Sequence, residues 1–201
     1  MGECFDREAI FFTGAIFVRT ILVLFGLTLA LTLALKFLVA PQYGEDVAER
    51  FLERLKYIPS QTEVLSQTTL ARWLADSTHA KAIRGYVFPV LFPLDILFLI
   101  CLGLFLGLAS TSLAERLGFL SAVPTWIWWI LPAFYMVSDL AEDAGLAATL
   151  NFWIRLTPDS FRVLSTLTAL KLATVTMAIG QFAFLGALKL LLFFFPPGRP
   201  V

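Results

Sequence analysis

The sequence predicts an all-α, polytopic membrane protein built as a bundle of four transmembrane helices. Hydrophobic residues make up 59% of the 201 positions, and the mean hydropathy is +0.82, whereas soluble domains are only about half apolar. Four apolar stretches are long enough to cross a bilayer, which takes about 20 residues each. Most charged residues lie between these stretches. We therefore expect residues 1–201 to form a single membrane domain.

The first span is expected over residues 14–40. Its apolar run is too long for a cleaved signal peptide, and Pro41 directly follows the Leu-Val-Ala that could mimic a cleavage site. We therefore expect a permanent span. Gly26, Ala30 and Ala34 recur every four residues, and such a stripe of small residues lets another helix approach closely.

Residues 41–85 form the expected extramembrane segment, with two short amphipathic helices. In the first helix, apolar residues recur at helical spacing among charged ones: Val47, Phe51, Leu55 and Ile58. Pro59 ends it. Ser60 and Glu63 have the spacing of a capping box, which predicts a second helix through about Ala75. We expect both helices to lie on the membrane surface or to cap the bundle. The alternative is a lid over a pocket or a partner-binding surface.

The second span is expected over residues 86–113. Pro89 and Pro93 lie in its first half, where each removes a backbone hydrogen bond and favours a kink. Asp95 follows them. Gly103 and Gly107 form a GxxxG pattern, which indicates a close helix crossing and is also common by chance.

The third span is expected over residues 124–153 and the fourth over residues 160–195. A tryptophan cluster opens the third span and Trp153 lies at its end, as expected of the belts at the two membrane interfaces. The cluster consists of Trp126, Trp128 and Trp129. Asp159, after Pro158, is the expected N-cap of the fourth span, and Pro196 is expected to stop it.

Four spans would place both termini on the same side of the membrane. Leaving out Lys171, that side holds 5 lysines and arginines, and the opposite side, with residues 41–85, holds 9. The positive-inside rule then predicts that residues 41–85 are cytoplasmic. We expect the protein in a bacterial inner (plasma) membrane. Its partners would be the lipid bilayer and other membrane subunits or a second copy; the formal net charge of +0 gives no indication of nucleic acid.

The third span holds three acids, at positions i, i+3 and i+4, which share one face of a helix. At about 1.5 Å per residue, Asp95 and Lys171 lie at nearly the same depth on neighbouring spans. Thr28 and Thr32 on the first span lie at a similar depth. Because charge in hydrocarbon is costly, acids at mid-span are candidate functional residues. The predicted buried charge network consists of Asp95, Asp139, Glu142, Asp143 and Lys171.

Several roles for this network follow from its chemistry. We favour an architectural core, in a structural or accessory protein of a membrane assembly, where Lys171 fixes the helices. A proton or cation relay in a transporter is an alternative, although four spans without an inverted repeat make a poor carrier unless the protein oligomerises. Another is a membrane enzyme acting on a lipid-like substrate, with Asp139 or Glu142 moving a proton and Asp143 and Asp95 as further catalytic candidates. A carboxylate-only site for a divalent cation is also conceivable. We expect no cofactor and no metal, and we favour a non-enzymatic role.

Several common catalytic motifs are absent from the sequence. The single histidine, His79, lies in the loop, and no HExxH, Cys/His cluster, glycine-rich phosphate loop or GxSxG occurs. Zinc hydrolase, haem and nucleotide chemistry are therefore disfavoured, as is a serine protease. Cys4 and Cys101 lack metal-site spacing, and we expect no disulfide between them.

Two short motifs resemble an uncharacterised family of small bacterial four-helix membrane proteins. Leu131-Pro132 with Asp139-Leu140-Ala141-Glu142 is similar to that family's third span, which has a Leu-Pro start and an Asp-x-x-Glu-Asn motif. Phe92-Pro93-Leu94-Asp95 is similar to its second span, and Trp73 to a tryptophan before that span. The chain departs from the pattern at Asp143, where the family has Asn. The resemblance implies the fold and no particular activity.

Overall fold

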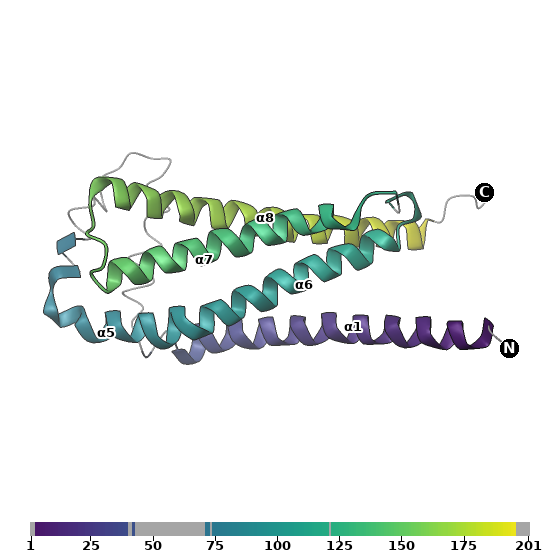
Figure 1. The fold of residues 1–201 in the computed structure, drawn as a ribbon, viewed down its shortest axis with the longest axis horizontal. Helices are drawn as coiled ribbons and strands as arrows, with labels where there is room; N and C mark the ends of the chain where they lie inside the picture. The colour runs from purple at the N-terminus through teal and green to yellow at the C-terminus, as the bar shows by residue number, and fades with distance from the viewer. Residues whose placement is uncertain (1–2, 40–41, 43–70, 73, 121, 196–201) are drawn as a thin grey trace.

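The computed structural model describes residues 3–39, 42, 71–72, 74–120 and 122–195, with side chains from Ile16 onward (Figure 1). All regular structure in these ranges is helical, without strands. The long helices α1 (Glu3–Leu33), α6 (Ile96–Glu115), α7 (Ile130–Leu150) and α8 (Pro158–Phe194) run along the long axis of the molecule. The start of α1 and the end of α8 lie at the same end (Figure 1).

Three helical stretches are long and apolar enough to cross a membrane, namely Ile16–Val39, Ser77–Glu115 and Pro158–Phe194. A membrane protein with an all-α fold is therefore supported. Helix α7 has 21 residues, enough in length, but its three acids set it apart from these stretches. Its crossing of the membrane therefore remains a proposal.

The first and last spans agree closely with the prediction, at Ile16–Val39 and Pro158–Phe194. Helix α1 begins earlier than its span, at Glu3, and a π-helical segment η1 (Ala34–Val39) continues it. Helix α8 begins at Pro158 with Thr157 as N-cap, so the prediction of Asp159 as N-cap was wrong. The Thr157 hydroxyl accepts from the Ser160 backbone N–H at 3.2 Å, and the Ser160 hydroxyl accepts from the Thr157 N–H at 2.8 Å. This reciprocal pair satisfies two backbone donors, and Pro158 suits the first helical position because it lacks an N–H.

The second span is interrupted where the sequence places its prolines. It begins with the 3₁₀ turn η4 (Ser77–His79) and α5 (Ala80–Gly85), and the π-helical segment η5 (Tyr86–Asp95) joins α5 to α6. Phe88 (φ −138°, ψ 115°) and Phe92 (φ −130°, ψ 116°) are extended, because the ring of a following proline disfavours the helical conformation. Both breaks lie just before Asp95, which is the last residue of η5.

The predicted helices of residues 41–85 lie mostly outside the described residues. The first of them lies there entirely, as do Trp73 and Pro196. Residues 71–72 and 74–75 are helical, in agreement with a second helix that ends near Ala75.

Helix α6 packs against α1, α7 and α8. Helices α7 and α8 lie antiparallel and side by side (Figure 1). Helix α6 approaches α7 through its two glycines: a Cβ on Gly103 would overlap Met136, and one on Gly107 would overlap the Trp129 ring. This is the close crossing that the GxxxG spacing predicted. A Cβ on Gly26 of α1, in contrast, would meet nothing within 4 Å.

Candidate functional site

The three acids of α7 lie buried on one face of that helix. Asp139 is 0% exposed, Glu142 4% and Asp143 5%. Tyr135 and Leu146, one turn before and one turn after, extend the same buried face. The opposite face of α7 is apolar and exposed at Phe134, Val137 and Leu140. The charged side of α7 therefore faces the protein, and its apolar side faces outward.

Lys171 on α8 joins two of these acids. Its ammonium group pairs with Asp139 Oδ1 and lies 3.1 Å from Glu142 Oε2. The Lys171 side chain is 23% exposed, compared with 1% and 6% for its two partners. Buried charges need such pairing, because unpaired ions lose far more hydration energy than the protein returns. One cation thus bridges one face of α7 to α8.

Hydroxyl groups extend the contact on both sides of Lys171. Thr168 donates to Glu142 Oε1, so Glu142 has a hydroxyl and an ammonium partner. Thr174 Oγ1 and Ser138 Oγ lie 3.2 Å apart, within hydrogen-bond distance, one turn further along both helices. Sequence analysis did not pair Ser138 with Thr174. A usable signal was present, since Ser138 directly precedes Asp139, and Thr174 lies three residues after Lys171 on the same side of α8.

Asp95 and Asp143 complete the cluster beside this ion pair. One carboxylate oxygen each from Asp95, Asp139 and Asp143 lies within 4.8 Å of the other two. Both Asp143 oxygens are buried and, within the described part of the chain, have no hydrogen-bond partner. The structure therefore brings the five predicted charged residues together. Lys171 pairs with Asp139 and Glu142, and Asp139 also belongs to a group of three carboxylates with Asp95 and Asp143.

The first span does not contribute its threonines in the way that was expected. Thr28 donates to the Leu24 carbonyl and Thr32 to the Thr28 carbonyl, each at 2.8 Å, so both hydroxyls are satisfied inside α1. The main packing partner of α1 is α6. The polar core is accordingly built from η5, α7 and α8.

The histidine and the cysteines singled out in the sequence belong to other parts of the chain. His79 lies in η4, with its Nε2 3.9 Å from Asp76. Cys101 is a buried free thiol in α6, and the side chain of Cys4 lies outside those described.

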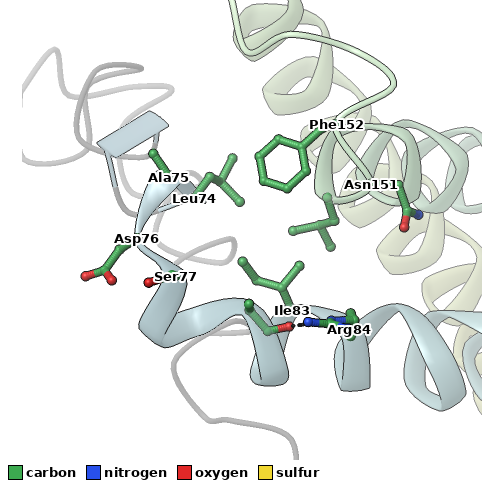
Figure 2. A pocket seen from close by; sticks show the side chains of 10 residues that line it. Leu74, Ala75, Asp76, Ser77, Ile83, Arg84, Asn151 and Phe152 are labelled. Atoms are coloured by element: carbon green, nitrogen blue, oxygen red, sulfur yellow. Dashed lines mark hydrogen bonds between the residues drawn. The ribbon is translucent and has the colours of Figure 1, made fainter.

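A pocket of about 490 Å³ lies at the end of the molecule where α7 ends and α5 begins. Its apolar lining includes Leu74, Ile83, Leu150 and Phe152, and Figure 2 shows Phe152 pointing toward Leu74 across the pocket while Asp76 points away. Leu150 is seven residues beyond Asp143, or about 10 Å along α7. The pocket is assembled from two stretches far apart in the chain, residues 74–84 and 150–152, which is why no single stretch of sequence predicted it. It does not open beside the acids.

No known protein family, curated protein or solved structure matches the chain. The interpretation of the site therefore rests on its geometry.

Proposed function

We propose that the protein is an integral membrane protein of four spans, in which the Lys171 ion pair holds α7 against α8 as an architectural core. The observation that carries the proposal is the contact of one ammonium group with two buried carboxylates of the neighbouring helix. Acids on a lipid-facing surface would be strongly unfavourable, whereas acids covered by another helix and paired with lysine are tolerated.

The shape of α7 supports its assignment as the third of four spans. Its 21 residues extend over about 32 Å, close to the thickness of a hydrocarbon core of about 30 Å. Its outward side chains Phe134, Val137 and Leu140 are 59%, 68% and 50% exposed and suit contact with lipid. Trp126 and Trp153, beyond its two ends, are exposed as interfacial anchors would be. Four spans would leave both termini on one side, opposite cytoplasmic residues 41–85.

An accessory role in a larger membrane assembly fits the first span. Helix α1 exposes apolar side chains along its described part from Ile16 onward, including Leu22, Val23 and Phe25. Gly26 and Ala30 are exposed on the same helix, as a stripe open to lipid or to another subunit would be. The resemblance to small bacterial four-helix membrane proteins belongs to this proposal.

A cation-handling role is the second candidate, because three carboxylate oxygens converge beside a single lysine. The acid/base enzyme receives less support. A lipid-modifying enzyme needs a pocket beside its acids, and the pocket at Leu150 opens about 10 Å away along α7.

Cysteine labelling tests whether α7 crosses the membrane. In a Cys4→Ser, Cys101→Ser background, Ala122→Cys reports on the turn before α7 and Arg155→Cys on the turn after it; both positions are exposed. A membrane-impermeant maleimide should label these two positions from opposite sides of sealed vesicles. Ser77→Cys, at the start of the second span, is the matched control and should label from the same side as Arg155→Cys. Labelling of positions 122 and 155 from one side would contradict a membrane crossing by α7.

A further inference from the structure

We infer that Asp95, Asp139 and Asp143 form a binding site for a hard divalent cation of the Ca²⁺ type. The inference deepens the cation-handling candidate by naming a ligand class for the same cluster. It depends on the arrangement of three side chains and not on the number of membrane spans.

The spacing of the three carboxylates suits one shared ion. Ca²⁺ binds oxygen at about 2.3–2.6 Å, so two oxygens on the same ion can lie up to about 5 Å apart. The three oxygens in question all lie within 4.8 Å of one another. They come from two chain segments, η5 and α7, so an ion would also tie the second span to α7.

Asp143 provides the independent sign of a ligand. Asp143 is 5% exposed, and neither of its carboxylate oxygens accepts a hydrogen bond from an N–H or hydroxyl group of the described residues. An ionised carboxylate buried without a partner is strongly unfavourable. Its oxygen points into the group formed with Asp95 and Asp139, so a cation there would supply the missing partner.

Lys171 cannot supply that partner for the whole cluster. Its ammonium group is engaged by Asp139 Oδ1 and by Glu142, and Glu142 also accepts from Thr168. Asp139 Oδ2 is buried and has no hydrogen-bond partner in the described ranges. The ammonium would repel a bound cation, and its own two carboxylate partners offset that repulsion. Asp139 can thus serve Lys171 with one oxygen and the cation with the other.

The donor set selects the class of ion. All three ligands are carboxylates, without a histidine or cysteine among them. Such ligands suit hard cations and not zinc or copper, which favour nitrogen and sulfur. Ca²⁺ tolerates the irregular geometry that ligands from two separate segments impose. An ion would enter the cluster from the side of Asp95. This residue is less buried than the other two and follows the break at Phe92.

Calcium binding to the full-length protein in detergent tests this site. Equilibrium binding of ⁴⁵Ca²⁺ should saturate at one ion per chain. Asp143→Asn and Asp95→Asn, which keep the side-chain shape and remove the charge, should each weaken binding about tenfold or more, since even residues that only support metal ligands cost that much when lost. Asp159→Asn, on the exposed first turn of α8, is the matched control and should bind like the parent. An absence of saturable binding, or an equal loss in Asp159→Asn, would overturn the inference.

Terbium luminescence keeps the test decisive if the aspartate variants do not fold. Tb³⁺ is a hard cation that binds carboxylate sites, and Tyr135, one turn before Asp139, is placed to sensitise it. In the parent protein, Tb³⁺ emission excited through tyrosine should rise with binding and be displaced by Ca²⁺. Absence of a signal that Ca²⁺ displaces would overturn the site. Failure of the labelling test on positions 122 and 155 would instead show that α7 does not cross the membrane and would leave this result unaffected.

Discussion

The helix pairs α7–α8 and α1–α6 are held together by different kinds of contact. Between α7 and α8, Lys171 bridges Asp139 and Glu142. Two hydroxyl contacts, Thr168–Glu142 and Ser138–Thr174, lie in the same interface. Between α1 and α6, the contact is apolar: Ile21 and Leu24 pack against a cluster that contains Phe105, whose ring lies 5.4 Å from that of Phe25. Hydroxyls on α1 bond to α1 itself.

This difference has a consequence for stability in a membrane. Lipid tails are as apolar as leucine, so apolar helices gain no hydrophobic free energy by associating and rely on packing alone. Helix α1 can therefore lose its partner and still face lipid. Helix α7, if it crosses the membrane as proposed, cannot, because separation from α8 would leave its buried acids in hydrocarbon. We expect substitutions in the α7–α8 contact to have the largest effects.

Lys171→Met should produce the largest loss of stability. Removal of one partner from a buried ion pair costs about 3–5 kcal/mol, because the remaining charges stay buried and unpaired. Thermal unfolding in detergent, followed by size-exclusion chromatography, would measure the loss. Lys189→Met, which removes a lysine whose Nζ donates to the Arg116 carbonyl at the end of α8, should change little.

A rescue variant separates lost charge balance from lost packing. Lys171→Met combined with Asp139→Asn and Glu142→Gln leaves no unpaired charge at the bridge and should recover much of the stability. If Lys171→Met were as stable as the parent, and Asp139→Asn and Glu142→Gln behaved like it, the ion pair would have no architectural role.

Gly107→Leu should come next, with a loss of about 1–3 kcal/mol from overpacking. A side chain at this position would meet the ring of Trp129, the residue directly before α7. Gly26→Leu makes the same change on α1, where space is open, and should be nearly neutral. Unfolding midpoints of the two variants, measured side by side, would compare the packed glycine with the open one. Equal losses would show that α1 has a close partner at Gly26.

The meeting of the five charged residues at one level of the bundle could be predicted from sequence, because helix geometry fixes position along each helix axis. Counting residues from the ends of the spans put Asp95, the three acids of α7 and Lys171 in one layer. Proline chemistry likewise placed the breaks of the second span at Phe88 and Phe92. These are local properties, set by rise per residue and by steric clash between adjacent residues.

The choice of partners could not be predicted in the same way. Which acids Lys171 would contact depends on the rotation of α7 and α8 about their axes, and no local pattern specifies that rotation. The N-cap of α8 was also missed: Asp159 and Thr157 are both good caps, and the reciprocal bond with Ser160 decides between them. Thr28 was predicted at a similar depth to the acids, but its hydroxyl bonds within α1, since depth alone does not say which way a hydroxyl faces.

Thr168→Val should cost about 1 kcal/mol, in the range of hydrogen bonds measured inside membrane proteins. The variant keeps the shape of the side chain and removes the donor to Glu142. Thr28→Val removes a hydroxyl that bonds within its own helix and should cost less. Denaturation of both variants in the same detergent would measure the difference. A larger loss for Thr28→Val would contradict the view that polar contacts matter chiefly between α7 and α8.

The smallest effect is expected at Asp76, where the same type of side chain lies in water instead of in the core. The Thr78 backbone N–H donates to Asp76 Oδ1 at 2.9 Å and its hydroxyl at 2.8 Å, and these bonds lower the pKa of the Asp76 carboxyl below its ordinary value of 3.8. Because the carboxyl pKa is lowered on folding, these two hydrogen bonds are fully formed above the ordinary pKa. They are lost as the pH falls through the lower pKa of the folded state. The amide of Thr78 should therefore lose protection from hydrogen exchange, after correction for intrinsic rates, only below about pH 4.

Asp76→Ala should remove that protection at every pH and leave the unfolding midpoint of the helices unchanged. A fall in that midpoint as large as the one expected for Lys171→Met would mean that an exposed carboxylate matters as much as a buried one, and the contrast between the membrane core and its surface would fail.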